Sequence, residues 1–149
     1  MEYPFGRIIT ALVTPMHADG TVDTESAKKL ASHIIQLGGD GILVNGTTGE
    51  ASTTHLNEKL LMIETLKSEF PNIPIMAGAG SNDTIHSISM AKESKKAGAD
   101  AILVVAPYYL RPSQDGIFEH YKAIAESVDD TPIIIYDVPG RTGVSISLD

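Results

Sequence analysis

Two hydroxyl side chains lie between glycines in the segment Gly-Thr-Thr-Gly-Glu at 46–50, directly after an apolar run. Thr47 and Thr48 would place O–H and backbone N–H donors on one tight turn. Such converging donors suit the two oxygens of a carboxylate. The same residue types are also common in an ordinary loop between a strand and a helix. The segment therefore predicts either a carboxylate-binding turn or a plain connection, and the spacing favours neither.

Phenols and a guanidinium follow two later apolar runs. Tyr136 ends one run and Arg141 comes five residues after it, while Tyr108 and Tyr109 follow an earlier run. A phenol beside a charged group can act as a general acid or base, and a guanidinium can hold a carboxylate through paired hydrogen bonds. A core tyrosine and a solvated surface arginine are the plainer interpretations. For Tyr108 we favour packing at an interface or over the core.

Several other chemistries lack their residue patterns. The chain has no cysteine, its five histidines show no i,i+4 pair, and no Gly-x-Ser-x-Gly segment occurs. We therefore expect no disulfide, no thiol or serine nucleophile and no metal site. The glycine-rich segment at 77–82 lacks the third glycine of a dinucleotide-binding turn, so no nucleotide cofactor is expected. It more simply indicates backbone that passes close to a ligand or a neighbour.

The eight lysines all fall within predicted helices, and none follows the end of a strand. A nucleophilic lysine must lose its proton near neutral pH, which requires burial or a nearby cation. We expect these helix-face lysines, Lys59 among them, to be solvated and charged, so no amine nucleophile is predicted within these residues. The inward face predicted for the helix at 55–70 consists of Leu56, Leu60, Ile63, Leu66 and Phe70.

The chain's 149 residues carry 11 Lys and Arg against 19 Asp and Glu, which gives a net charge of −8. This acidic balance argues against nucleic acid as a partner, because phosphate backbones attract basic surfaces. No run approaches the roughly 20 apolar residues of a membrane span. The first residues also lack the basic-then-apolar layout of a signal peptide. We expect a cytoplasmic protein without a membrane or nucleic-acid partner.

Apolar strands alternate with amphipathic helices along the whole chain. Because the strands are apolar without alternation, they indicate a parallel sheet that is covered by helices. Polar residues follow several strand ends, which favours a (β/α)8 barrel over a doubly wound open sheet with one switch point. The predicted strands cover residues 7–15, 41–44, 73–77, 101–105 and 132–138, and the predicted helices cover 23–37, 55–70, 83–97 and 113–128.

A short internal repeat supports a fold built from repeated strand and helix units. Gly-Asp-Gly-Ile-Leu-Val at 39–44 matches Ala-Asp-Ala-Ile-Leu-Val at 99–104, which places Asp40 and Asp100 sixty positions apart. That separation equals two of the predicted strand-helix units. No linker or low-complexity stretch interrupts the series, so we expect one architectural unit.

Four motifs together resemble the dihydrodipicolinate synthase family. They are Thr-Pro at 14–15, Gly-Thr-Thr-Gly-Glu at 46–50, Pro-Tyr-Tyr-x-Arg-Pro at 107–112 and Tyr-Asp-Val-Pro-Gly-Arg-Thr-Gly at 136–143. The resemblance covers essentially the whole chain, in order and at similar spacings. It implies that residues 1–149 are the N-terminal portion of a single (β/α)8 barrel domain, with about the first five strands and four helices.

The resemblance also implies an activity. Members of this family condense pyruvate with aspartate semialdehyde on the route to diaminopimelate and lysine. A lysine on the sixth strand forms a Schiff base with pyruvate, and that lysine would lie beyond Asp149. The family needs no cofactor and assembles as a homo-oligomer, a dimer of dimers.

The resemblance assigns roles to five residues of this chain. Thr48 would hold the pyruvate carboxylate, and Arg141 would bind the carboxylate of the semialdehyde. Thr47, Tyr109 and Tyr136 would form a proton relay, with Tyr136 as the general acid and base beside the imine. In the family, the residue at the Tyr109 position usually reaches across a dimer contact into the neighbouring site.

Two alternatives remain open from the sequence. Sialic acid lyases and keto-deoxy sugar acid aldolases share the Gly-x-x-Gly-Glu turn, but they generally do not combine Thr-Thr there with the tyrosine pair and Arg141. A non-catalytic half-barrel that associates with itself is an alternative of another class.

The chain also has Asp137 where family members often have Asn, which would add negative charge near the site.

Overall fold

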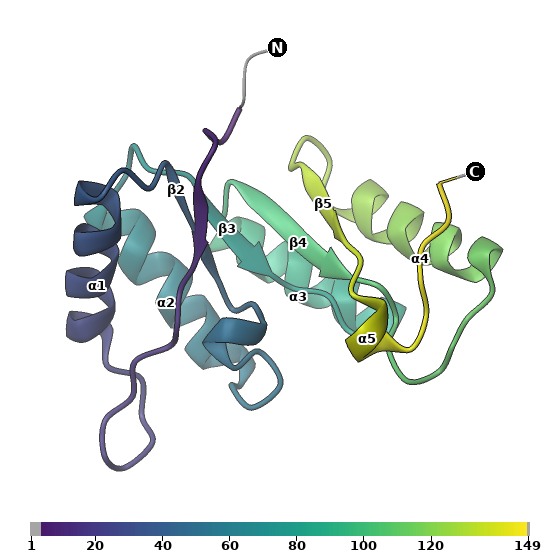
Figure 1. Cartoon of the computed structure of the whole chain (residues 1–149), viewed down its shortest axis with the longest axis horizontal. Coiled ribbons are helices and arrows are strands. Elements are labelled where there is room, and N and C mark those ends of the chain that lie inside the picture. Colours follow the sequence, from purple (N-terminus) through teal and green to yellow (C-terminus); the bar gives the residue numbers. More distant parts are fainter. Residues whose placement is uncertain (1–3, 149) are drawn as a thin grey trace.

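The computed structural model describes residues 4–148, in which strands and helices alternate from end to end (Figure 1). The five strands form one parallel sheet in the order β1-β2-β3-β4-β5. The elements are β1 (Ile9–Ala11), α1 (Thr24–Gln36), β2 (Gly41–Val44), the 3₁₀ turn η1 (Thr47–Gly49), α2 (Leu56–Glu69), β3 (Ile75–Gly78), α3 (Thr84–Lys96), β4 (Ala101–Val105), α4 (Gln114–Ser127), β5 (Ile133–Tyr136) and α5 (Pro139–Thr142).

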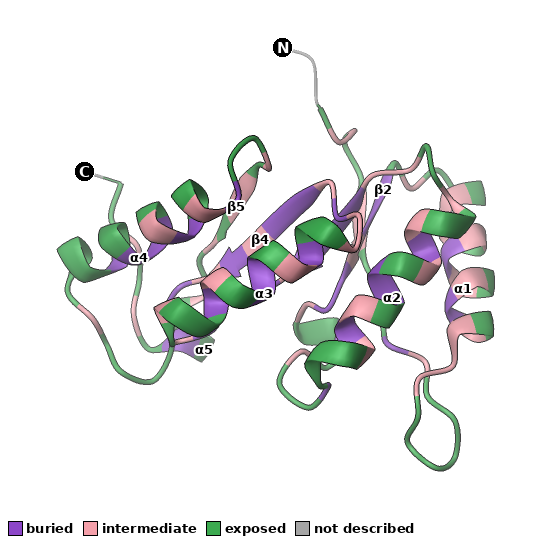
Figure 2. Cartoon of the chain, turned by 180° about the vertical axis from the view of Figure 1, so that it is seen from behind, coloured by how far each residue is buried: buried purple, intermediate pink, exposed green. Residues whose placement is uncertain are grey.

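Helices α1 to α4 all cover the same face of the sheet, and their buried sides turn toward it (Figure 2). Neighbouring helices pack on one another in chain order, α1 on α2, α2 on α3 and α3 on α4. A doubly wound sheet carries helices on both faces, whereas barrel crossovers all lie outside. The arrangement is therefore that of a half-barrel, as predicted. The largest fully buried side chains between sheet and helices include Ile42, Ile63, Ile75, Ile102 and Ile124.

The predicted helices are confirmed, and polar residues cap their first turns. The side chains of Asp23, Asp83 and Ser113 each accept a backbone N–H from the first turn of α1, α3 and α4. These bonds satisfy donors that have no partner inside the helix. Gly38 follows α1 with a φ of +96°, the left-handed conformation that glycine adopts without strain.

Three strands are shorter than the runs that predicted them. The run at 7–15 contributes only β1, because its pairing ends where the Leu12 N–H donates to β2. The run at 73–77 becomes strand two residues late, since Pro74 has no N–H for the ladder. The run at 132–138 contributes only the four residues of β5.

The repeated aspartates hold equivalent places in the sheet. Asp40 precedes β2, and its carboxylate accepts the N–H groups of Arg7 and Ile8 at 2.7 and 2.9 Å. These bonds lower the pKa of Asp40. Asp100 precedes β4, and its carboxylate accepts the Ile75 N–H at 2.8 Å. Each aspartate thus ties the start of the preceding strand to the next strand along, which explains the repeat as structural.

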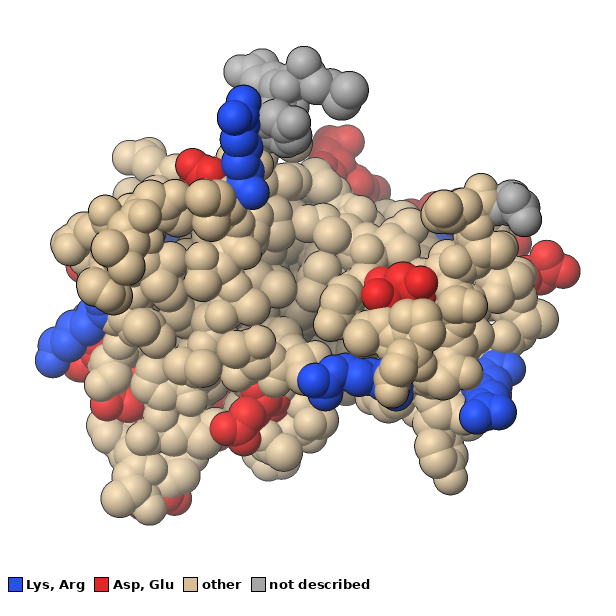
Figure 3. All heavy atoms as spheres, viewed as in Figure 1, with Lys and Arg blue, Asp and Glu red and all other residues tan. Residues whose placement is uncertain are grey.

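The two edge strands leave backbone groups and apolar side chains open. Within residues 4–148, β1 and β5 each pair with one neighbour only. Ile8, Val13 and Ile135 are 57%, 47% and 59% exposed. The face of the sheet opposite the helices carries few charges over its middle and is hollowed there (Figure 3). Open edges and exposed apolar surface both favour association.

We expect the isolated 149-residue chain to associate with itself in solution. Pairing of edge strands and burial of the open apolar face both drive this association. Sedimentation velocity at several concentrations measures it, and a single monomeric species at all of them would contradict the expectation.

His120 is a buried titratable group between α3 and α4. Its exposed fraction is 4%, and its Nδ1 lies 2.9 Å from the hydroxyl of Thr84. Its Nε2 has no hydrogen-bond partner among the described residues, and the ring meets Tyr121 edge-on. Burial lowers the pKa of His120, an effect that the nearby Asp83 partly opposes. The neutral imidazole is therefore the form that the fold accommodates.

This burial predicts that the protein loses stability as the pH falls below about 6.5, the pKa of an unfolded histidine. Below that value the unfolded chain binds a proton that folded His120 does not, so stability falls until the lowered folded pKa is reached. The loss is at most about 1.4 kcal/mol per pH unit for one proton. Urea unfolding of the wild type and His120→Asn between pH 5 and 8 tests this. An equally steep loss in the variant would assign the effect to other groups.

Candidate active site

A pocket opens where the carboxyl ends of β2 to β5 meet. Parallel strands bring these ends to one side of the sheet, so residues far apart in sequence gather there. The pocket is lined by Asn45, Gly46, Thr47, Ala51, Ser52, Gly78, Gly80, Leu103, Val105, Tyr108, Tyr136, Val138, Arg141 and Thr142.

The segment at 46–50 forms a tight turn beside this pocket. The first hydrogen bond of η1 runs from the Gly49 N–H to the Gly46 carbonyl at 3.0 Å. The N–H groups of Thr47 and Thr48 precede that bond and, like those at any helix start, have no partner within the turn. Backbone donors and two hydroxyls therefore lie together, as a carboxylate-binding turn requires.

Strained residues and a close contact fix the shape of this turn. Asn45 and Glu50 flank it with φ values of 57° and 58°, a conformation uncommon outside glycine. The hydroxyl of Thr14 donates to the Gly49 carbonyl at 2.7 Å. A Cβ at Gly49 would lie 3.0 Å from the Leu12 carbonyl oxygen, so the backbone after β1 packs tightly against the turn at this position. Leu12 and Thr14, which follow β1, thus contact the turn and restrain its shape.

Asn45 is a buried anchor whose role the sequence analysis missed. It is 2% exposed, and its side-chain amide donates to the Lys59 carbonyl at 3.1 Å. On its other side the backbone of β3 approaches so closely that a Cβ at Gly78 would lie 2.2 Å from the Asn45 carbonyl oxygen. The glycine-rich segment at 77–82 is therefore a place where backbones meet, as predicted. An Asn directly before Gly, a pair that favours positive φ, is the signal that could have found Asn45.

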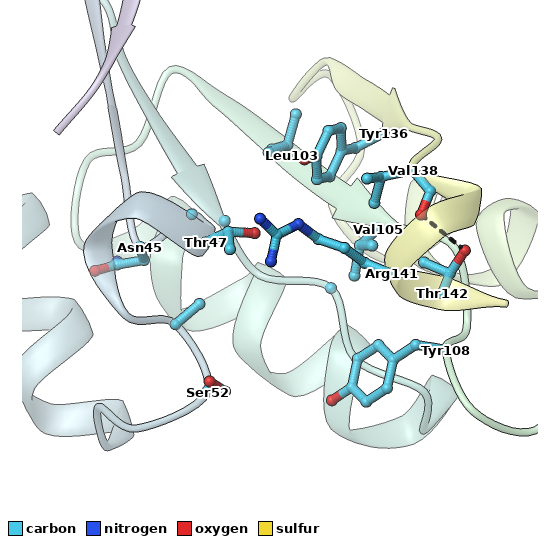
Figure 4. Close-up of a pocket in the computed structure, with 14 residues that line it drawn as sticks. Asn45, Thr47, Ser52, Leu103, Val105, Tyr108, Tyr136, Val138, Arg141 and Thr142 are labelled. Atoms are coloured by element: carbon cyan, nitrogen blue, oxygen red, sulfur yellow. Dashed lines mark hydrogen bonds between the residues drawn. The ribbon is translucent and has the colours of Figure 1, made fainter. Parts of the chain in front are cut away.

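Three of the five predicted site residues come together in the pocket. In Figure 4 the guanidinium of Arg141 extends from α5 toward the hydroxyl of Thr47, and the ring of Tyr136 lies beside Leu103 at the end of β5. Within residues 4–148 the side chains of Thr47, Tyr136 and Arg141 have no hydrogen-bond or ion-pair partner. A tyrosine, a threonine and an arginine without partners around one pocket are free to bind a ligand.

The other two predicted residues lie outside the lining of the pocket. Thr48 is exposed on the same turn as Thr47. Tyr109 is 86% exposed, with a φ of 72°, and its N–H donates to the Thr142 carbonyl at 3.1 Å. Tyr108 lines the pocket and is 39% exposed, and its packing at an interface stays a prediction. Asp137 is exposed and does not line the pocket.

The expectation that all lysines are solvated is wrong for Lys59. Its exposed fraction is 8%, and its Nζ donates to the hydroxyl of Thr54 at 3.0 Å and to the Thr54 carbonyl. Burial lowers the pKa of Lys59, which the neighbouring Glu58 partly opposes. Lys59 does not line the pocket, nor does any other lysine among the described residues.

No cluster of three or more His, Asp or Glu side chains that could hold a metal ion occurs in residues 4–148. None of the helices described there is long and apolar enough to cross a membrane.

Comparisons with known proteins identify a single family. Residues 4–149 match the model of the dihydrodipicolinate synthetase family. A 4-hydroxy-tetrahydrodipicolinate synthase of Bifidobacterium longum (strain DJO10A) is 54% identical over 145 residues, which are 97% of this chain and 48% of the relative. A dihydrodipicolinate synthase structure from Bacillus anthracis superposes with a TM-score of 0.94 at 43% identity, covering 98% of this chain and 50% of that one.

A further solved structure carries a ligand. It is the chloride-inhibited dihydrodipicolinate synthase from Acinetobacter baumannii complexed with pyruvate, with a TM-score of 0.90 at 48% identity over 94% of this chain and 48% of that one. The chain spans about half the length of the curated relatives it matches. Its half-barrel corresponds to the N-terminal part of their (β/α)8 barrels. From the family match over 4–149 and the agreement in fold, the chain belongs to the dihydrodipicolinate synthetase family.

Proposed function

We propose that the complete protein carrying this chain is a lyase that condenses pyruvate with aspartate semialdehyde through a Schiff base, in the biosynthesis of diaminopimelate and lysine. The observation that carries the proposal is the group formed by Thr47, Tyr136 and Arg141. These side chains have no partner of their own in residues 4–148, and they surround one pocket at the strand ends. The names of the relatives and the pyruvate complex of one of them support it.

For this reaction the protein must bind the carboxylates of both substrates and transfer several protons. We assign the pyruvate carboxylate to the turn at 46–50, where Thr48 and the backbone N–H groups converge. We assign the semialdehyde carboxylate to Arg141, because a guanidinium matches two oxygens at once. We assign residues 1–149 to the N-terminal portion of one barrel domain, whose reacting amine is supplied outside them.

The amine attacks the carbonyl carbon of pyruvate, and the carbonyl oxygen leaves as water to give an imine. Loss of a methyl proton gives an enamine, whose carbon attacks the aldehyde carbon while the aldehyde oxygen takes up a proton. We assign the transfer of these protons to the hydroxyls of Tyr136 and Thr47, since both residues line the pocket. Tyr109, which is exposed here, would join the relay of a second copy. That role fits a homo-oligomer, a dimer of dimers, and we propose a cytoplasmic location for it.

Trapping the imine tests the proposal. Treatment of the complete protein with pyruvate and borohydride is expected to leave a covalent pyruvate adduct on a lysine outside residues 1–149. All eight lysines of this chain are expected to stay unmodified, because none lines the pocket among the described residues. Peptide mass spectrometry locates the adduct. An adduct on Lys59 or on any other lysine of this chain would contradict the assignment.

The aldehyde substrate is tested separately. The complete protein is assayed with pyruvate and aspartate semialdehyde, and in parallel for cleavage of keto-deoxy sugar acids and sialic acid. Turnover of the semialdehyde is expected, since Arg141 offers a site for its carboxylate. Turnover of a sugar acid alone would replace the proposed synthase with a related pyruvate-dependent aldolase.

A further inference from the structure

Lys59 is a buried cation that the proposed reaction does not use. It lies in the first turns of α2, is 8% exposed and has no carboxylate within ion-pair distance among the described residues. A buried charge is costly unless its hydrogen bonds are satisfied. Here its ammonium is committed to the carbonyl and hydroxyl oxygens of one residue, Thr54.

Thr54 connects Lys59 to the C-terminal end of the turn at 46–50. Its N–H and its hydroxyl both donate to the Glu50 carbonyl, at 3.1 and 3.2 Å. Glu50 is the residue with a φ of 58° that ends η1. A strained backbone of this kind persists only where its surroundings hold it. Through Thr54, the Lys59 side chain thereby supports the C-terminal end of the turn.

The main chain of Lys59 supports the N-terminal end of the turn. Its carbonyl accepts the Asn45 side-chain amide at 3.1 Å, and Asn45 is the residue with a φ of 57° that begins the turn. One residue of α2 is therefore linked to both flanks of the turn. Its carbonyl accepts from Asn45 directly at one end, and its ammonium donates to Thr54, which in turn donates to Glu50, at the other. Thr47 and Thr48 lie between these two contacts.

We propose that Lys59 is a positioning residue that fixes the turn at 46–50 in its carboxylate-binding shape. This inference rests on the proposed function, in which that turn binds the pyruvate carboxylate. A turn that already has its binding conformation loses no conformational entropy when the ligand binds. Its donors therefore bind the carboxylate with higher affinity. Lys59 touches neither substrate in this assignment and acts through Thr54 and Asn45.

The test is Lys59→Met in the complete protein, which keeps an unbranched apolar side chain and removes the ammonium. It leaves the Thr54 oxygens without their buried donor. The KM for pyruvate is expected to rise about tenfold, while kcat and the KM for the semialdehyde change less than about threefold. Lys59→Arg is expected to restore much of the loss, because it keeps a cationic donor.

Lys67→Met is the matched control. Lys67 lies two turns further along α2, pairs with Asp100 at 2.8 Å and touches no part of the turn at 46–50. It is expected to lower the melting temperature and to leave the KM for pyruvate unchanged. An unchanged KM in Lys59→Met, or an equal rise in Lys67→Met, would overturn the proposal.

Two further measurements decide the remaining cases. If Lys59→Met does not fold, Thr54→Val removes the Thr54 hydroxyl, which is one of the two acceptors of the Lys59 ammonium and one of the two groups by which Thr54 donates to the Glu50 carbonyl. A rise in the KM for pyruvate then supports the proposal, and an unchanged KM refutes it. If the wild type has no synthase activity, the proposed function fails, and hydrogen exchange decides the positioning role. Faster exchange at 46–54 in Lys59→Met but not in Lys67→Met supports it, and equal exchange refutes it.

Discussion

Replacing Tyr136 by Phe in the complete protein is expected to lower kcat by about 10²–10⁴-fold, the usual contribution of a positioned general acid or base. The substitution removes one oxygen and keeps the ring that lies beside Leu103 in the pocket. Tyr136 ends β5 and its hydroxyl has no partner among the described residues, so the fold does not depend on that oxygen. Steady-state kinetics with pyruvate and aspartate semialdehyde measure the effect.

Tyr121→Phe is the matched control for this variant. The Tyr121 hydroxyl is buried and donates to the Val104 carbonyl at 2.9 Å, on the helix side of the sheet and outside the lining of the pocket. Burial raises the pKa of Tyr121 to about 12, so it stays protonated throughout the assay range. This variant should lose about 1 kcal/mol of stability and keep its kcat. Tyr136→Phe with nearly full activity would remove Tyr136 from the relay.

The helices could be predicted well because their signals are local. Asp23, Asp83 and Ser113 bond to N–H groups only three residues ahead, so the residues that fix each start are visible in the sequence. Strand limits depend on partners far away in the chain. The run at 7–15 looks like one long strand, and only its pairing with β2 shows that it contributes three paired residues.

The inward face of α2 was predicted only in part. Leu56 was expected inside but is 38% exposed, while Lys59 and Met62 are buried together with Ile63 and Leu66. The buried set follows the helical spacing i, i+3, i+4 and i+7, and a lysine at its first position hid the pattern. The burial of Lys59 depends on Thr54, whose oxygens accept hydrogen bonds from the Lys59 ammonium. No rule based on residue type alone predicts such a contact.

The site was predicted where it follows from the fold, and missed where it depends on single backbone angles. Thr47, Tyr136 and Arg141 meet because parallel strands end on one side of the sheet. Tyr108 and Tyr109 follow the same strand, and their types do not tell which of them faces the pocket. Tyr108 lines the pocket, whereas Tyr109, whose φ is 72°, is 86% exposed.

Gly78→Ala is expected to cost about 3 kcal/mol of stability, at the upper end of the range for overpacked sites. The new Cβ would lie 2.2 Å from the Asn45 carbonyl oxygen, 2.8 Å from its carbonyl carbon and 3.2 Å from the Gly46 nitrogen. All three are backbone atoms, so no side chain can rotate away. Relief requires β2 and β3 to separate, although Val44 and Ala77 pair directly beside this point.

The same displacement would move Asn45 and with it the turn at 46–50, so the variant should lose pyruvate binding as well as stability. Gly116→Ala is the control, because a Cβ there meets only the Ser113 hydroxyl at 3.4 Å and Pro112 at 3.5 Å, which are ordinary contacts. Alanine in a helix is favoured over glycine by up to about 1 kcal/mol, so Gly116→Ala should be neutral or stabilising. Urea unfolding of both variants measures the difference. If Gly78→Ala were as stable as Gly116→Ala, β2 and β3 would have to lie further apart at this point than the contact with Asn45 allows.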